Sequence, residues 1–533
     1  MKNPFGGFGK KYKEQKEVTI MRTAAIFTDN MVLQREKPIK VWGDGKDGRR
    51  VTVTLGGQSA SDTVRDGKWR VTLPPMPAAE GLTMTIRSGA VQIVYRDIAV
   101  GEVWLCGGQS NMEYEIKDEL NGQTLLDSLT PDCGVRFYYT PKQQMIDGDF
   151  ERAERQTAWN KATPEGARAW SAVGLYFGLE LAQKLGVTVG LIGCNWGGTS
   201  ASAWVSRDVL EAETALHPYL EDYDKAVAGK TDAELIAAYD EYTAYQAKWW
   251  GDYSKLLEKQ PDISWNDALK IVGESHYPGP MGPKNENRPC GLYETMLQRV
   301  CPYTLRGFLY YQGESDDHRP ETYETLLTAL IGCWRRDWND SELPFLNVQL
   351  PMFRTAYDPD YKHWCRIREA QANVYRKLRH TGLAVLADGG EFDNIHPKEK
   401  ATVGHRLVLQ ALCEVYHRMP RAKASAPMLR LGYPLGNSYV IRTEHAPEGF
   451  RLTGEAAGFE LAGADGVFHP ANAAFAPDCI TLTAKDVPAP QFARYAWTNY
   501  MQVTVFGMNG LPLAPFRTDH MPLSADQPAC TDV

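Results

Sequence analysis

The pattern of apolar and polar residues changes twice along the chain and divides it into three regions. Up to about residue 100, short segments such as 51–55 and 69–73 alternate or run apolar between Gly, Asp and Pro, which predicts antiparallel strands. Residues 101–430 instead combine apolar runs of strand length with longer segments of helical spacing. Short strands return after residue 431, for example at 439–442 and 480–483. The pattern predicts a central α/β region with a β region on either side.

The central region predicts a mostly parallel sheet. Its apolar strands are expected at 98–106, 187–192, 308–311, 345–350 and 383–386, and the helices between and after them at 171–185, 321–334, 367–378 and 400–416. The first of these helices has the clearest boundaries, because Ser171 can cap its start and Gly186 can end it. Alternating strands and helices form parallel sheets that carry helices on both faces.

These patterns predict the domain organisation. Residues 1–20 are polar and rich in lysine and are expected to be a flexible extension before Met21. An N-terminal β domain is expected at 21–100, the α/β domain at 101–430 and a C-terminal β domain at 431–533. Residues 205–305 interrupt the alternation with a polar, helix-prone part rich in Tyr and Trp and a later part rich in Gly and Pro. We expect this insertion to pack over the sheet edge or over the site.

Chemically useful groups follow the predicted parallel strands. Ligands of such sheets bind outside the carboxyl ends of the strands, so these segments are expected to meet. The segments are Gly108-Gln109-Ser110-Asn111, Trp196-Gly197-Gly198-Thr199, Gln312-Gly313-Glu314-Ser315, and the loop with Asp393 and His396. Together they supply a hydroxyl nucleophile, backbone and amide donors, and an imidazole with a nearby carboxylate. Acyl transfer needs this set of groups.

The spacing of Asp393 and His396 occurs a second time in the chain, at Asp360 and His363. Asp360 follows a proline in a loop, where solvation or helix capping explains it. Asp393 and His396 lie before the final helix, with Pro397 suited to the helix start. Capping or a surface role remains an alternative for this pair too. A catalytic His396 predicts that kcat/KM falls on acidification through a pKa of roughly 6 to 7.

The four segments, in this order, resemble the blocks of the SGNH-type hydrolases, and their details resemble the sialate O-acetylesterase family. Residues 101–104, 368–371 and 510–518 are similar too, so the resemblance covers nearly the whole chain. It implies a flavodoxin-type parallel sheet with helices on both faces as the catalytic domain at 101–430. The flanking β domains are then expected to be β-sandwich-like.

The same resemblance implies roles for individual residues. Ser110 is the expected nucleophile, His396 the general base and Asp393 its orienter. The expected oxyanion hole consists of the backbone N–H groups of Ser110 and Gly198 with the side-chain amide of Gln312, and Gly197 is the alternative backbone donor. At the third block the usual Gly-x-Asn is replaced by Gln312-Gly313-Glu314, so the role of Gln312 is less secure than the triad. Glu314 is expected to be structural, since a carboxylate aimed at an oxyanion would oppose catalysis.

Composition and charge limit the kinds of molecule that the protein is expected to bind. The net charge is −8 and no basic run stands out, which argues against nucleic acid as the main partner. No apolar stretch reaches the length of a membrane span. The ten cysteines include no Cys-x-x-Cys pair, and histidines such as His217, His276 and His405 have no spacing typical of ligands, so we expect neither a metal nor a cofactor. No signal peptide is visible, which predicts a cytoplasmic protein.

Three hypotheses about function remain open at this point. The first is a serine esterase that removes O-acetyl groups from a sugar, with 9-O-acetylated sialic acid as the expected substrate. The second is an acetylesterase for oligosaccharides derived from xylan or mannan. The third is a carbohydrate-binding protein with a catalytically dead core, although such a protein has no need to keep Ser110, Asp393 and His396 together. The oligomeric state cannot be predicted from the sequence.

Overall fold

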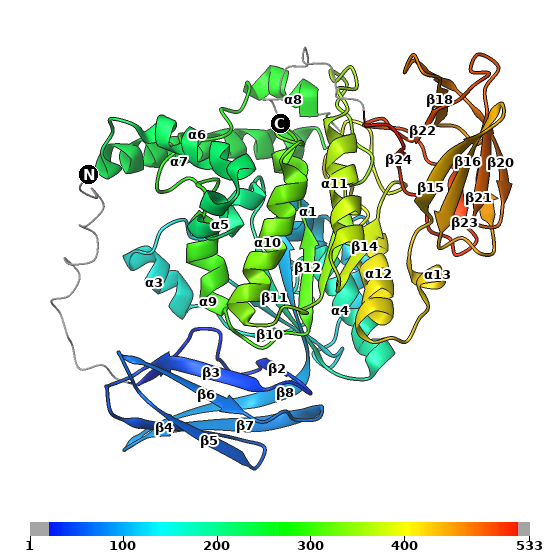
Figure 1. The fold of residues 1–533 in the computed structure, drawn as a ribbon. Coiled ribbons are helices and arrows are strands. Elements are labelled where there is room, and N and C mark those ends of the chain that lie inside the picture. Colours follow the sequence, from blue (N-terminus) through cyan, green and yellow to red (C-terminus); the bar gives the residue numbers. More distant parts are fainter. Residues whose placement is uncertain (1–20, 262, 264, 521–533) are drawn as a thin grey trace.

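The computed structural model describes residues 21–261, 263 and 265–520, and the predicted extension at 1–20 lies outside them (Figure 1). A sheet of parallel strands forms its centre, with an antiparallel strand β10 (Asn160–Lys161) at one edge. The parallel strands lie in the order β9 (Val135–Tyr139), β11 (Val189–Asn195), β8 (Val91–Gly108), β12 (Gly307–Tyr311), β13 (Phe345–Gln349) and β14 (Thr381–Val385). All five predicted strands are present, and β9 is additional. Without β9, the order of the other five in sequence terms is 2-1-3-4-5, which is the flavodoxin-type order.

Helices pack on both faces of this sheet. Helices α4 (Ala172–Leu185) and α12 (Ala401–Gln410) contact one another and cover one face, whereas α10 (Tyr323–Trp338) and α11 (His363–Lys377) form the other pair (Figure 1). The predicted boundaries of α4 are confirmed. The Ser171 side chain accepts a hydrogen bond from the Gly174 N–H, and Gly186 ends the helix with a φ of +67°. Helix α12 begins only at residue 401, so Pro397 precedes it in the loop instead of starting it.

The N-terminal β region grows directly out of the central sheet. Strand β8 is continuous from residue 91 to 108, so the boundary expected at residue 100 falls inside one strand. Its first half pairs with β2 (Val32–Gln34) and β7 (Ala79–Ser88), and β7 continues to β4 (Arg50–Leu55) and β5 (Gln58–Thr63). A second sheet consists of β1 (Arg22–Thr23), β3 (Ile39–Asp44) and β6 (Lys68–Leu73). The apolar residues of this region and of the central sheet form one continuous core.

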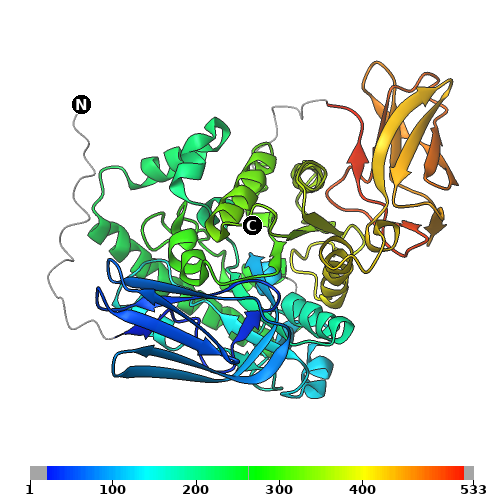
Figure 2. The same cartoon turned by 60° about the horizontal axis from the view of Figure 1, so that its bottom comes forward.

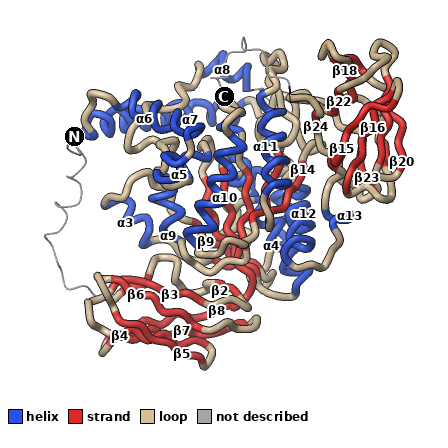
Figure 3. Tube along the Cα trace, in the orientation of Figure 1, coloured by secondary structure: helices blue, strands red, loops and turns tan. Residues whose placement is uncertain are grey.

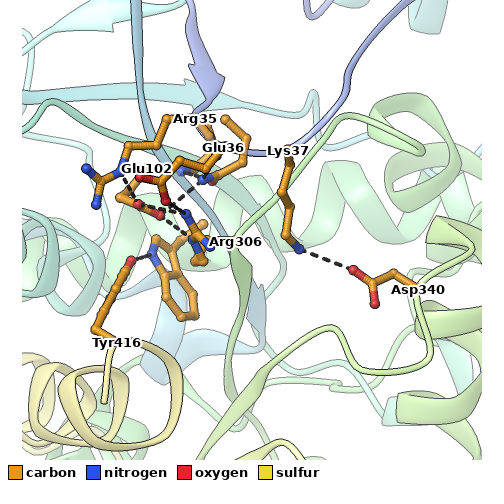
Figure 4. A network of polar contacts seen from close by, with 10 residues as sticks. Arg35, Glu36, Lys37, Glu102, Arg306, Asp340 and Tyr416 are labelled. Carbon is orange, nitrogen blue, oxygen red and sulfur yellow. Dashed lines mark hydrogen bonds and ion pairs between the residues drawn. The ribbon is translucent and has the colours of Figure 1, made fainter. Parts of the chain in front are cut away.

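A buried carboxylate joins the two regions (Figure 4). Glu102, in the middle of β8, has no exposed surface and accepts hydrogen bonds from Arg35 Nε at 2.6 Å and from Arg306 Nε at 2.6 Å. Although burial acts to raise it, the pKa of Glu102 is lowered by these two guanidinium groups. The ion pairs lie at the amino end of the central strands, opposite the end where the predicted site residues meet.

The insertion at 205–305 is helical, as predicted for its first part. It contains α5 (Arg207–Ala212), α6 (His217–Val227), α7 (Asp232–Lys259), α8 (Trp265–Val272) and α9 (Gln298–Val300). Thr231 and Glu234 form a capping box that fixes the start of α7. In Figure 1, α6, α7 and α8 lie at the end of the molecule toward which the central strands run. Tyr277, between α8 and α9, contacts Gly198 there, so the insertion reaches the predicted site.

The C-terminal β region stands apart from the N-terminal one (Figures 2 and 3). One sheet has the order β15 (Met428–Leu435), β16 (Ser438–Glu444), β21 (Cys479–Thr483), β20 (Asn472–Ala476), and the other β19 (Phe468–Pro470), β18 (Phe459–Ala462), β22 (Phe492–Tyr495), β24 (Phe516–Arg517). Strands β17 (Phe450–Leu452) and β23 (Val505–Gly507) form a separate pair. This region has its own core, which extends onto α11 and β14. Among the described residues, no helix has the length and apolar character needed to cross a membrane.

Candidate active site

The carboxyl ends of β8 and β14 bring the predicted nucleophile and base together. Ser110 is the first residue of α1 (Ser110–Glu113), directly after β8, and His396 lies in the loop between β14 and α12. His396 Nε2 is 2.8 Å from Ser110 Oγ, within hydrogen-bond distance. The two residues are 286 positions apart in the sequence. This geometry allows the imidazole to take the serine proton, as the predicted nucleophile–base pair requires.

The environment of His396 favours the neutral imidazole. Burial, followed by the positive charge of Lys400, lowers the pKa of His396 to about 4. This value is lower than the range of 6 to 7 expected from the sequence, because the sequence does not reveal that the ring is buried beside a cation. At neutral pH the imidazole is therefore unprotonated and can act as a base.

Asp393 lies in the same loop as His396, as predicted. Its Oδ1 accepts a hydrogen bond from the Ala356 N–H at 3.1 Å, and its own N–H donates to the Arg354 carbonyl at 3.0 Å. Its φ of +59° falls in the left-handed region, which aspartate tolerates better than most residues. These contacts join the His396 loop to the segment after β13. The role of Asp393 as the orienter of His396 stays a prediction.

The second Asp-x-x-His pair serves another purpose. Asp360 Oδ1 accepts from the Asn499 N–H at 2.7 Å, and its Oδ2 accepts from the Thr498 hydroxyl at 2.8 Å. Asp360 therefore ties the segment before α11 to the C-terminal β region. A structural role, as expected from its position in a loop, is consistent with these contacts.

The loop after β11 lies against the nucleophile. A Cβ on Gly197 would be 3.2 Å from Ser110 Cβ, so a larger residue would push against the nucleophile by a few tenths of an ångström. The Gly197 N–H already donates to Glu113 Oε2 at 2.6 Å. This contact favours Gly198 over Gly197 as the backbone donor of an oxyanion hole. The Gly198 carbonyl in turn accepts from the Tyr277 hydroxyl at 2.8 Å and from Asn287 Nδ2 at 2.9 Å.

The side-chain amide of Gln312, the predicted oxyanion donor, is bonded to other groups of the protein. Its side chain is fully buried, and its Nε2 donates to Asp316 Oδ2 at 2.5 Å and to the Thr199 carbonyl at 3.2 Å. These two bonds use both amide hydrogens, so this conformation leaves none for an oxyanion. The reason is Asp316, a buried carboxylate that also accepts from the Ser200 hydroxyl and the Ala201 N–H. Gln312 contributes instead to fixing the loop that contains Gly198.

Comparisons with known proteins place the chain among carbohydrate esterases. A family model described as "Carbohydrate esterase, sialic acid-specific acetylesterase" matches residues 284–413. Sialate O-acetylesterases from Mus musculus and Homo sapiens are 27% and 26% identical over 428 residues, which is 74% of this chain and 73% and 71% of theirs. The crystal structure of a carbohydrate acetylesterase from Xanthomonas citri is 26% identical, with a TM-score of 0.75 over 94% of this chain and 100% of that chain. The chain is a carbohydrate esterase related to the sialate O-acetylesterases. The predicted resemblance is confirmed.

Two polar residues of the esterase were missed at the sequence level. Asn111 follows the predicted nucleophile, and Lys400 lies four residues after His396, yet the sequence pattern assigns no role to either. Both side chains are fully buried and hydrogen-bonded to one another, with Lys400 Nζ 2.7 Å from Asn111 Oδ1. The short distance of each from a predicted catalytic residue was the available signal. Burial was the missing information, since an exposed asparagine and lysine would have the same spacing.

The esterase has no evident metal centre in the part of the chain that the structure describes. No group of three or more His, Cys, Asp or Glu side chains in those residues is arranged to hold an ion. His405, one of the histidines considered from the sequence, pairs instead with Glu180 at 2.9 Å.

Proposed function

We propose that this esterase is an SGNH-type serine hydrolase that removes O-acetyl groups from sugars, with 9-O-acetylated sialic acid as its substrate. The observation that supports the reaction best is the 2.8 Å distance between Ser110 Oγ and His396 Nε2. The flavodoxin-type strand order supports the SGNH-type assignment, because it places both residues at the carboxyl ends of the sheet.

In the proposed reaction Ser110 Oγ attacks the acetyl carbonyl carbon while His396 Nε2 takes the serine proton. The N–H groups of Ser110 and Gly198 stabilise the oxyanion of the tetrahedral intermediate. His396 then donates its proton to the sugar oxygen as the ester bond breaks, which leaves an acetylated Ser110. Water, deprotonated by His396, attacks the acetyl carbon, and His396 returns the proton to Ser110 Oγ as the acyl bond breaks and acetate leaves. Asp393 is the proposed orienter of His396 during both steps.

The choice of sugar rests on two arguments. The mammalian relatives are named as sialate O-acetylesterases, and the matching family description names sialic acid. In addition, the ester on C9 of the glycerol tail of sialic acid is primary and therefore less hindered than an ester on a ring hydroxyl group. Three aromatic residues near the site offer exposed faces to a sugar: Tyr277, Tyr357 and Phe392 are 40%, 76% and 46% exposed.

Acetate release tests both parts of the proposal. The wild-type enzyme is incubated with 9-O-acetyl-sialic acid, and in parallel with acetylated xylo- and manno-oligosaccharides, and the products are separated by chromatography. We expect loss of the acetylated sialic acid peak, and a loss of activity on the order of a million-fold for Ser110→Ala. Ser438→Ala, on a hairpin of the C-terminal region, is the matched control.

Each other outcome has a definite meaning. Deacetylation of the oligosaccharides but not of the sialic acid would replace the proposed substrate by a xylan- or mannan-derived one. Binding of a sugar without release of acetate from any ester would support the carbohydrate-binding alternative. Full activity in Ser110→Ala would refute the serine mechanism itself.

A further inference from the structure

The two residues on either side of His396 are both bonded to the interior of the protein. The carbonyl of Ile395 accepts a hydrogen bond from Asn111 Nδ2 at 3.0 Å, and the carbonyl of Pro397 accepts one from Lys400 Nζ at 2.6 Å. Asn111 and Lys400 are bonded to one another, and Asn111 is adjacent to Ser110 in the chain. The backbone on both sides of the base is thus connected to the residue next to the nucleophile.

A buried carboxyl group completes this cluster. Glu314, from the segment after β12, accepts from Asn111 Nδ2 at 2.7 Å through its Oε1. Burial raises the pKa of Glu314 to about 7, so below neutral pH the carboxyl group is mostly uncharged. Asn111 therefore links three loops that are distant in sequence, after β8, after β12 and before α12.

Lys400 is an unusual residue at this place. Its side chain has no exposed surface, and its ammonium group lies 4.7 Å from the centre of the Tyr114 ring. Burial of an ammonium group is costly unless hydrogen bonds and favourable charges compensate for it. Burial lowers the pKa of Lys400 to about 8, so the group is still charged at neutral and acidic pH. A methionine of similar length would fill the same space without that cost, which indicates that the charge itself has a use.

We propose that Asn111 and Lys400 are positioning residues of the esterase, which hold the backbone on both sides of His396 in place beside Ser110. The charge of Lys400 also acts on the imidazole, because a nearby cation disfavours the imidazolium whatever the source of its proton. This inference rests on the proposed function, because it assigns a purpose to the geometry of the Ser110–His396 pair. It goes beyond the triad, since neither residue belongs to it.

The direction of the charge effect follows from the groups around His396. The carboxylates on neighbouring segments, each of which would favour the imidazolium, are Asp393 and Glu391 in its own loop and Glu113 on α1. Glu314, after β12, is mostly uncharged in the acidic range where His396 titrates. Tyr114, whose ring lies 6.4 Å from the imidazole, is uncharged because burial raises its pKa to about 12. The pKa of His396 is lowered first by burial and then by the charge of Lys400.

The test compares Lys400→Met with Lys40→Met over a range of pH. Lys40 is the control because it lies on β3 of the N-terminal region, and its half-buried amine donates to the carbonyl of Trp338, at the end of α10. With an aryl acetate as substrate, we expect the acid limb of kcat/KM in the wild type near pH 4 to 5. In Lys400→Met the limb should move upward by about one pH unit, and kcat should fall by about ten-fold or more while KM changes little. Lys40→Met should reproduce the wild-type profile.

Three results would overturn the inference. The first is an acid limb of the wild type at the ordinary histidine value of 6 to 7, and the second is an unchanged limb in a folded Lys400→Met. If Lys400→Met does not fold, Lys400→Gln is measured in the same way, because it is uncharged but keeps an N–H donor. An unchanged acid limb in Lys400→Gln is the third result. Failure of the proposed function is distinguishable, because the wild type would then not hydrolyse the ester at all or Ser110→Ala would hydrolyse it equally well.

Discussion

Replacement of Gly198 by alanine tests whether the backbone after β11 is part of the catalytic machinery. Gly198 has a φ of +71°, in the left-handed region. For a residue with a Cβ this conformation costs roughly 1–2 kcal/mol. Gly48, in the N-terminal β region, has a φ of +77°, and a Cβ built on it would have nothing within 4 Å. Gly48→Ala therefore has the same conformational cost without any clash. The pair of variants therefore separates backbone strain from effects on the site.

The structure predicts different consequences for the two variants. A Cβ on Gly198 would overlap the hydroxyl oxygen of Tyr277 and lie 3.1 Å from its Cζ, so either the Tyr277 ring or the Gly198 peptide must move. The hydrogen bond from Tyr277 to the Gly198 carbonyl contributes on the order of 1 kcal/mol. We expect the free energy of unfolding to fall by about 1–2 kcal/mol in Gly48→Ala and by roughly one more in Gly198→Ala.

The effect on catalysis should differ far more than the effect on stability. Displacement of an oxyanion donor typically costs about 100- to 1000-fold in kcat. Hydrolysis of an aryl acetate and denaturant unfolding, measured on both variants, give the two quantities. We expect a loss of this size for Gly198→Ala and wild-type kcat for Gly48→Ala. A kcat of Gly198→Ala within about three-fold of that of Gly48→Ala would refute the expectation that the Gly198 peptide moves and removes an oxyanion donor.

Two further predictions concern carboxylates. Asp393→Asn should lower kcat/KM by about a thousand-fold or more if Asp393 orients the imidazole. Asp360→Asn affects the contact with Asn499, so it should lower the stability and leave the kcat of the folded enzyme unchanged. Equal kinetic losses in the two variants would contradict the assignment. Glu102→Gln should lower the free energy of unfolding by roughly 3 kcal/mol at pH 7, because the mostly buried guanidinium groups of Arg35 and Arg306 lose the charge of Glu102, and among the described residues only Arg306 keeps a second partner, Glu36. The folded-state pKa of Glu102 lies below the usual 4.5, so the stabilisation is present above that value and is lost as the pH falls through the lower folded-state value. Denaturant unfolding at pH 7 and pH 3 checks this, and a difference between wild type and variant that does not shrink at pH 3 would contradict it.

The organisation of the central domain could be predicted because its signals are local. Ser171 caps the start of α4 and Gly186 ends it, and an apolar run forms β11. Each of these signals lies within or next to the element that it defines. The position of Ser110 and His396 at one end of the sheet follows from the same elements, since parallel strands direct their carboxyl ends to one side. The continuity of β8 was not visible, because the polar residues Arg96 and Asp97 resemble a turn in the sequence.

What only the tertiary structure decided is how the polar side chains are paired. Gln312 was predicted as an oxyanion donor because glutamine has the required N–H groups, yet these are bonded to Asp316 and Thr199. Lys400 and Asn111 had no assigned role, because their importance depends on a hydrogen bond between residues 289 positions apart. Burial likewise changes the pKa of His396 by an amount that no local pattern encodes. The sequence by itself determined the elements and the residue types at the strand ends, because both depend on the nearest neighbours in the chain. Hydrogen-bond partners and the electrostatic environment depend on which distant segments are brought together and from which side water is excluded, and those follow only from the complete fold.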